Sequence, residues 1–216
     1  MANKQVGILI SGRGSNMSAL IAAASAADFP ADIRLVVSNR PHAGGLAKAA
    51  EAGIATAVVD HKDYPSREAF DKAVTAKLEE AGVEFVCLAG FMRLLTPWFV
   101  ERWRDRLINI HPSLLPSFKG LDTHERALEA GVKVHGCSVH FVRSDVDSGP
   151  IIAQAAVAVL DEDDADSLAT RVLEQEHVIY PLALRLVASG RVRVIDERVE
   201  IGGAGDAPPA LVVPAV

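Results

Sequence analysis

The feature that most constrains the fold is an alternation of short apolar runs with longer helical patterns along the first half of the chain. The apolar runs are rich in valine, isoleucine and leucine, as buried strands are. This order predicts parallel strands joined by helices, which makes a doubly wound α/β sheet. We expect strands at 6–11, 33–39, 55–60 and 84–90, and helices at 15–27, 44–53 and 66–82.

The second half continues with mixed elements. Two runs, 135–142 and 150–159, alternate like antiparallel strands. The sequence contains no internal repeat, and no linker separates two domains. We therefore expect one domain over 1–201 and a loosely ordered Gly-, Ala- and Pro-rich tail over 202–216. Further strands are expected at 107–113 and 191–196, and helices at 97–105, 122–130 and 165–189.

Composition narrows the class of protein. The net charge of −6 gives no overall attraction to nucleic acid or to anionic membranes. No apolar run approaches the roughly 18 residues that span a bilayer, and the glycines at 12 and 14 interrupt the N-terminal run too early for a secretory signal. Cys87 and Cys137 lie in apolar runs and are expected to be reduced core thiols. We therefore expect a cytoplasmic protein without nucleic-acid or membrane partners. The sequence leaves its oligomeric state open.

Ligands of doubly wound sheets bind where loops leave the carboxyl ends of the strands. The first such loop reads "SGRGSN", and Gly14, Ser15 and Asn16 open the first helix. Backbone N–H groups at a helix N-terminus favour an anion, so we interpret this loop as a monophosphate site. The Lys of a Walker A loop is absent, and Met17 stands where a dinucleotide fingerprint needs its third glycine. A tight turn without a ligand and a nicotinamide site remain as alternatives.

A second polar group follows a later strand. Asn109 and His111 are two residues apart, so on a strand they face the same side. Asp147 lies in the acidic loop "SDVDSGP". An amide can donate to an oxyanion, an imidazole can stabilise it or move a proton, and a carboxylate can orient the imidazole. Each residue alone is typical of an ordinary strand or turn. Together they predict acyl transfer directly between two bound substrates, because no nucleophile elbow and no metal-ligand spacing is present.

Several motifs then occur in one order: "ISGRGSN", "LAGFMRLL", "NIHPSLLPSFKG", "HGCSVHFV", "DSGPII" and "QEHVIYP". Through them the chain resembles the phosphoribosylglycinamide formyltransferases of de novo purine synthesis, from about Val6 to Val194. The resemblance implies a Rossmann-like, mostly parallel seven-stranded sheet with an antiparallel edge. It implies that the formyl group of 10-formyltetrahydrofolate, the co-substrate, is transferred to the amine of glycinamide ribonucleotide through a tetrahedral intermediate. It implies no metal ion.

The resemblance also implies roles for individual residues. A cis peptide at Leu115–Pro116 would shape the pocket. Leu173 stands where the family often has a polar residue, which puts one minor ribonucleotide contact in doubt. Arg67 is equally typical of a solvated helix. The implied residues are Asn109, His111 and Asp147 for catalysis, Gly14, Ser15, Asn16 and Glu176 for the ribonucleotide, and Arg67, Met92, Arg93, Leu94, Leu95 and Val142 for the folate.

Three rival functions remain. A 10-formyltetrahydrofolate hydrolase shares the catalytic core, but that family carries an extra N-terminal domain, whereas this chain starts directly on its first strand. A formyltransferase for initiator methionyl-tRNA would carry a C-terminal RNA-binding domain, and the net charge of −6 disfavours tRNA. A non-catalytic nucleotide-binding module would leave Asn109, His111 and Asp147 without a shared purpose.

Overall fold

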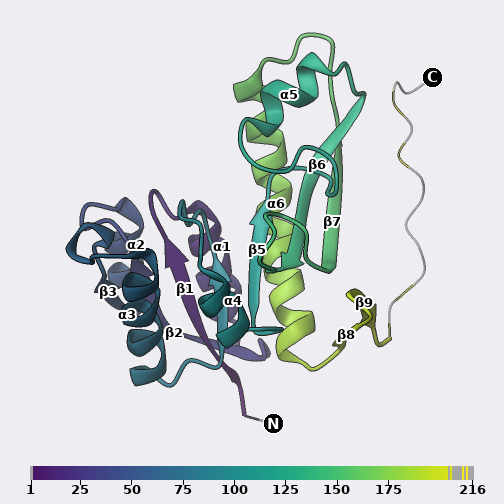
Figure 1. The fold of residues 1–216 in the computed structure, drawn as a ribbon. Coiled ribbons are helices and arrows are strands. Elements are labelled where there is room, and N and C mark those ends of the chain that lie inside the picture. Colours follow the sequence, from purple (N-terminus) through teal and green to yellow (C-terminus); the bar gives the residue numbers. More distant parts are fainter. Residues whose placement is uncertain (1, 204, 206–210, 212, 214–216) are drawn as a thin grey trace. The chain divides into compact units, whose positions relative to one another are not determined.

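The computed structural model describes residues 2–203, 205, 211 and 213 (Figure 1). Contacts group the chain into two compact units, which we call unit 1 (Met1–Asn109 and Phe141–Ser144) and unit 2 (Ile110–His140 and Asp145–Val216). Seven strands form one sheet in the order β3-β2-β1-β4-β5-β6-β7, and β8 pairs with β9. The predicted single domain over 1–201 stays a prediction, and most of the predicted tail over 202–216 lies outside the described residues.

Unit 1 contains the doubly wound half of the sheet. Neighbouring strands from β3 through β5 pair in parallel, with β1 between β2 and β4. A Cβ on Gly7 would lie 2.5 Å from Leu78 Cδ2, so glycine at this position lets α3 pack closely on β1. The elements are β1 Lys4–Ile10, α1 Ser15–Ala24, β2 Ala31–Ser38, α2 Gly44–Glu51, β3 Ala55–Val58, a 3-10 turn η1 His61–Asp63, α3 Arg67–Glu80, β4 Phe85–Leu88, α4 Pro97–Arg102 and β5 Leu107–His111, whose last two residues belong to unit 2.

One core cluster of unit 1 lies between the strands and the helices α3 and α4. Phe70 of α3 and Trp103, which ends α4, are each about 1% exposed and pack against side chains of β1, β2, β4 and β5. Burying a side chain of this size stabilises a fold by roughly 1.5–3 kcal/mol. Ser66 and Thr96 accept backbone N–H groups at the first turns of α3 and α4, which fixes where both helices begin.

Unit 2 is built around a long helix and an antiparallel strand pair, which run side by side in Figure 1. A Cβ on Gly136 would lie 1.9 Å from the Ala155 carbonyl oxygen, so only glycine permits this approach of β6 to β7. The capping box of Asp164 and Ser167 begins α6. The elements are α5 Thr123–Glu129, β6 Val134–Phe141, whose last residue belongs to unit 1, β7 Ile151–Ala158, α6 Ala165–Ala188, β8 Val192–Ile195 and β9 Arg198–Ile201.

The predicted mostly parallel, seven-stranded sheet with an antiparallel edge is confirmed, since β6 and β7 pair antiparallel. The strand β9 was not expected. It pairs with β8 across Asp196 and Glu197, which both have positive φ, at 48° and 56°. A two-residue turn of this kind usually carries Asn-Gly or Asp-Gly. The sequence therefore gave no hairpin signal here.

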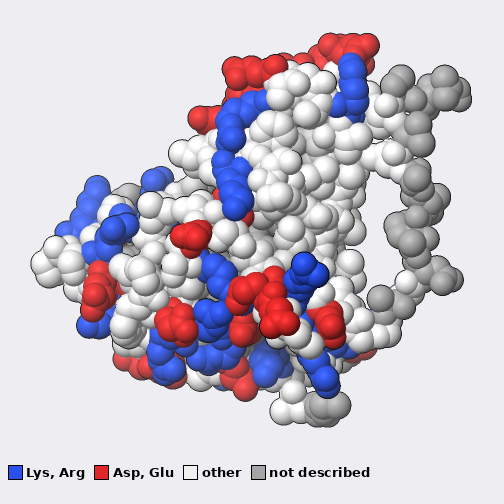
Figure 2. All heavy atoms as spheres, turned by 45° about the vertical axis from the view of Figure 1, so that its right-hand side comes forward, with Lys and Arg blue, Asp and Glu red and all other residues white. Residues whose placement is uncertain are grey.

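The surface carries charges of both signs. On the face drawn in Figure 2, basic and acidic side chains are interspersed. In unit 1, for example, Arg143 lies 2.7 Å from Asp105, and Arg102 pairs with Glu79. The Arg102–Glu79 pair is exposed, and exposed pairs contribute little to stability.

Candidate active site

A buried polar contact of unit 2 joins two of the predicted catalytic residues. His111, the last residue of β5, is 6% exposed, and its Nδ1 lies 3.4 Å from Oδ2 of Asp147. The same Oδ2 accepts the N–H of Gly120 at 2.9 Å, while Oδ1 lies 3.7 Å from Nε2 of the buried His140. Asp147 has a positive φ of 48°, a backbone conformation that turns its loop. We call His111 and Asp147 the His–Asp pair.

The second ring nitrogen of His111 also faces an acceptor. Nε2 lies 3.1 Å from the carbonyl oxygen of Phe118, and a carbonyl oxygen can only accept, so this nitrogen carries the hydrogen. Nδ1 faces a carboxylate oxygen of Asp147. In its protonated form the ring therefore has an acceptor for each N–H. A cation held in this way can donate to an oxygen that gains negative charge during a reaction.

The loop that carries Phe118 is fixed by a small network in unit 2. The Ser138 hydroxyl donates to the Ser113 carbonyl at 2.7 Å and accepts the N–H of Leu115 at 3.0 Å. Gln154 donates to the Leu115 carbonyl at 3.0 Å. The suggested cis peptide at Leu115–Pro116 is present. These contacts hold the loop against β6 and β7, and so hold the carbonyl that faces His111.

Asn109 lies two residues before His111 on β5, as predicted, and is half-buried. Its strand pairs with β4, with Asn109 opposite Leu88. By contacts Asn109 belongs to unit 1, whereas the His–Asp pair belongs to unit 2. His140 was missed, although it follows Ser138 at a strand spacing of two, and two polar residues on one face of a buried strand are a usable signal.

The predicted phosphate-binding residues form the glycine loop, which we define as Gly12–Asn16. Gly14 has φ 69° and ψ 35° and stands at the N-cap of α1, so the chain turns sharply into the helix at this point. The first turn of α1 has no acidic residue, and Asn16 is 8% exposed. Backbone N–H groups at such a terminus can hold an anion.

Four of the predicted folate-binding residues, 92–95, lie between β4 and α4. Of the other two, Arg67 begins α3 and Val142 follows β6. Met92 and Leu94 are 64% and 62% exposed, an unusual exposure for large apolar side chains. The Arg93 guanidinium lies 5.2 Å above the ring of Phe70. Leu95 and Val142 are partly buried and pack against the core of unit 1, and Arg67 is exposed at the start of α3.

Asp71 was missed by the sequence analysis. Its carboxylate is 1% exposed and accepts both the N–H of Thr96 at 2.8 Å and the hydroxyl of Thr96 at 2.6 Å. Burial raises the pKa of this carboxyl, and the contacts with Thr96 and the charges of Arg93 and Arg67 oppose that rise. Through Thr96, Asp71 thus anchors the end of the segment Met92–Leu95. A charged residue on the buried face of α3 was the available signal.

Glu176 lies on α6 in unit 2 and is 7% exposed. Burial, and then the negative charge of Glu176, raise the pKa of the Cys137 thiol to about 12. Cys137 and Cys87 are both buried and are not joined in a disulfide, as expected for core thiols. Leu173, one turn before Glu176, is partly exposed.

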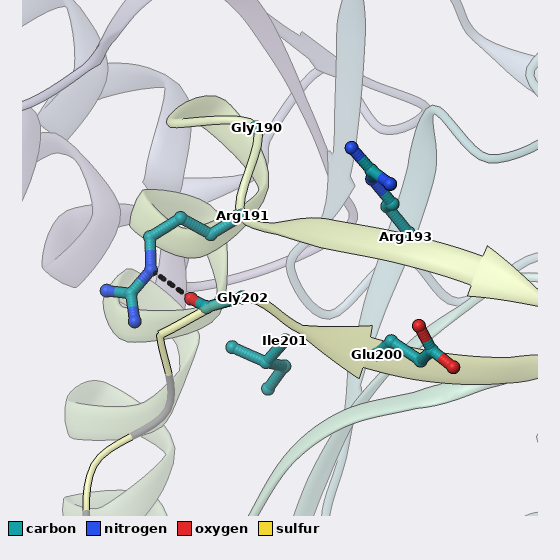
Figure 3. Close-up of a pocket in the computed structure, with 6 residues that line it drawn as sticks. All are labelled: Gly190, Arg191, Arg193, Glu200, Ile201 and Gly202. Carbon is teal, nitrogen blue, oxygen red and sulfur yellow. Dashed lines mark hydrogen bonds between the residues drawn. The ribbon is translucent and has the colours of Figure 1, made fainter.

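A further hollow lies beside β8 and β9. The hollow beside the β8–β9 hairpin contains none of the predicted site residues, and Arg191 donates across it to the Gly202 carbonyl at 2.8 Å (Figure 3). Within the described part of the chain, no group of three or more His, Cys, Asp or Glu side chains is placed to hold a metal ion. None of the described helices is long and apolar enough to cross a membrane.

Most of the chain is similar to known proteins. Residues 4–184 match the family described as formyl transferase. The phosphoribosylglycinamide formyltransferase of Escherichia coli is 44% identical over 196 residues, which cover 91% of this chain and 92% of that protein. The crystal structure of glycinamide ribonucleotide transformylase 1 from Symbiobacterium toebii superposes with a TM-score of 0.91 at 46% identity, covering 93% of this chain and 94% of that one.

A longer relative is also similar. The trifunctional purine biosynthetic protein adenosine-3 of Gallus gallus is 54% identical over 190 residues, which are 88% of this chain and 19% of that protein. This chain thus spans about a fifth of the length of that relative.

Proposed function

This chain belongs to the formyl transferase family, and from this premise we propose that it transfers the formyl group of 10-formyltetrahydrofolate to the amine of N1-(5-phospho-D-ribosyl)glycinamide. The protein is then a one-carbon transferase of purine biosynthesis whose substrates are two small molecules. The proposal concerns formyl transfer alone and no other activity of the trifunctional relatives.

The observation that supports this reaction most is the buried His–Asp pair. When the amine attacks the formyl carbon, the carbonyl oxygen gains negative charge as a tetrahedral intermediate forms. We assign His111 as the cationic donor to that oxygen, and Asn109, two residues away on the same strand, as a neutral donor. Asp147 orients the ring and stabilises its positive charge. Collapse of the intermediate breaks the bond from carbon to the folate nitrogen, and the proton lost by the amine passes to that nitrogen.

The contact with Phe118 suggests how His111 becomes available. Its Nε2–H donates to a neutral carbonyl oxygen at 3.1 Å. A negative oxygen accepts a hydrogen bond more strongly than a neutral one does, so the developing oxyanion can compete for this hydrogen. The contact between Nδ1 and Asp147 is unaffected by that exchange. We infer that the His111 Nε2–H donates to the Phe118 carbonyl oxygen before the reaction and to the oxyanion during the reaction.

The remaining assignments follow the two substrates. We assign the glycine loop to the ribonucleotide phosphate, because its N–H groups at the start of α1 suit an anion. We assign Glu176, a buried carboxylate of unit 2, to a polar part of the same substrate.

For the folate we assign an apolar wall and a cation. The exposed side chains of Met92 and Leu94, with Leu95 and Val142, supply apolar surface for the pterin ring, and Arg93 lies beside them. Arg67 supplies an exposed positive charge for the glutamate carboxylates. The net charge of −6 leaves no general attraction for nucleic acid or membrane, and we propose a cytoplasmic location.

A single assay tests the proposal. The protein is mixed with 10-formyltetrahydrofolate with and without the ribonucleotide, and both formylated product and free formate are followed. We expect product only when the amine is present. Release of formate without the amine would identify a hydrolase, and absence of any turnover would identify a binding module. His111→Ala, carried through the same assay, shows whether turnover belongs to this protein or to a contaminant.

A further inference from the structure

We propose that Gly45, the second residue of α2, is a positioning residue for the ribonucleotide, because it fixes the backbone of the glycine loop from behind. The inference rests on the proposed function, which assigns that loop to the phosphate. Gly45 lies far from the loop in sequence, belongs to another helix, and carries no side chain that could contact a substrate.

The contact between Gly45 and the loop is made by backbone atoms alone. The Gly45 N–H donates to the Gly12 carbonyl at 3.0 Å. A Cβ built on Gly14 would lie 3.0 Å from the Gly45 Cα. A Cβ built on Gly45 would lie 3.2 Å from the Gly12 oxygen and 3.3 Å from the Gly14 Cα. All three Cβ distances are shorter than ordinary van der Waals contact. The two segments therefore fit together because positions 14 and 45 are both glycine.

A side chain at 45 must therefore displace something. Its nearest neighbour would be Ile10 Cδ1 at 2.6 Å, the far end of a buried side chain that can change rotamer. The other two neighbours belong to the backbone of the glycine loop, which cannot rotate away. Relief of those contacts moves Gly12 and Gly14 by a few tenths of an ångström relative to α1. Hydrogen bonds from backbone N–H groups to a phosphate depend on distance and angle at that scale.

The chain supplies a matched control in the preceding residue. Gly44 lies in the same first turn of α2, is exposed, and a Cβ added there would meet nothing within 4 Å. Alanine gains the same helix propensity at both positions. Gly44→Ala and Gly45→Ala therefore differ in one respect, the contact with the glycine loop and Ile10.

The experiment measures steady-state kinetics of both variants against each substrate. We expect Gly45→Ala to raise KM for the ribonucleotide about tenfold, the loss of about one charge-assisted hydrogen bond, while KM for 10-formyltetrahydrofolate stays within about twofold. Gly44→Ala should match the unmodified protein. Equal increases in both KM values, or an unchanged ribonucleotide KM, would overturn the inference. Absence of turnover in the unmodified protein would instead sink the proposed function, so the two failures are distinguishable.

A second variant separates the loop from the core. Ile10→Val removes the Cδ1 atom that a side chain at 45 would meet first. In the double variant Ile10→Val/Gly45→Ala the core contact is relieved and the backbone contacts remain, so the ribonucleotide KM should stay raised relative to Ile10→Val alone. A return to the value of Ile10→Val would show that Gly45 acts on the core and not on the loop. This comparison also serves if Gly45→Ala alone folds poorly.

Discussion

The glycine loop of unit 1 and the His–Asp pair of unit 2 are polar sites built in opposite ways. The loop consists of consecutive residues at the start of α1, and its backbone N–H groups belong to the helix N-terminus. The pair joins the end of β5 to a distant turn through buried side chains, and backbone groups of Phe118 and Gly120 complete its contacts. The loop depends on conformation and on close packing of glycines. The pair depends on charge, burial and the exact partners of each ring nitrogen and each carboxylate oxygen.

The comparison predicts different failures. Substitutions in the pair should reduce the rate of the chemical step, while substitutions in the loop should reduce affinity for one substrate. Substitutions at both sites and a change of pH test that division.

Removing the imidazole should have the largest effect. We expect His111→Ala to lower kcat about 100- to 1,000-fold with both substrates still binding, because a donor to the oxyanion is lost. Asn109→Ala should behave similarly. Single-turnover rates and calorimetry of each substrate measure the two parts separately. Near-normal turnover of a folded His111→Ala protein would show that the pair is structural.

Neutralising the carboxylate tests the role of charge within the pair. Asp147→Asn keeps an oxygen that can accept the Gly120 N–H at the position of Oδ2, but removes the negative charge that faces His111 and His140. We expect kcat to fall about 100-fold. The control is Asp145→Asn, because Asp145 is an exposed residue of the same loop. Equal losses in both variants would assign the effect to the loop as a whole.

Acid should weaken the folded protein through His135, a histidine beside the loop that carries Phe118. His135 is fully buried and its ring lies 5.8 Å from that of Phe118. Burial, and then the charges of His124 and His111, lower the pKa of His135 from 6.5 to about 4. The unfolded chain takes up this proton near pH 6.5, so stability is complete above that pH and falls as pH drops from 6.5 to 4.

The loss attributable to His135 is about 3 kcal/mol at most, at 1.36 kcal/mol for each pKa unit. Urea unfolding at several pH values measures it, with His135→Gln as the comparison. We expect the variant to be less stable at pH 7 and to lose less stability between pH 6.5 and 4. Parallel curves would show that other groups cause the acid sensitivity.

A side chain in the glycine loop should affect one substrate only. Gly14→Val meets both the unfavourable φ of 69° and the Gly45 Cα, so we expect ribonucleotide affinity to fall about tenfold or more while folate affinity is spared. Calorimetry with each ligand measures this. Gly82→Val, at φ 68° with open space around it, imposes the backbone strain elsewhere and should leave both affinities unchanged. Equal losses for both ligands in Gly14→Val would indicate misfolding.

The smallest effect is expected at an exposed cation. Arg67→Ala should weaken folate binding by about 1 kcal/mol at low salt and by less at high salt, because exposed charge pairs are screened. Lys77→Ala, an exposed cation in the last turn of the same helix, should leave folate affinity unchanged. If Arg67→Ala binds folate normally at low salt, Arg67 is only a solvated helix residue.

Much of the architecture follows from local patterns. The periodicity of apolar residues predicted the strands and helices of the doubly wound half and the antiparallel pair β6–β7, because each pattern reflects which face of one element is buried. The short motifs identified the glycine loop, since a turn into a helix is a local conformation of consecutive residues. The strand β9 escaped because Asp196 and Glu197 are uncommon in a two-residue hairpin turn.

The sequence by itself determined which residue types could carry the chemistry, and the tertiary structure alone decided what faces them. The carbonyl of Phe118, the amide of Gly120 and His140 became partners of the pair only when the loop, the strand and the turn packed together. Backbone groups of this kind occur at every residue and leave no mark in a sequence. The same holds for Gly45, whose missing side chain matters only because the glycine loop lies against it.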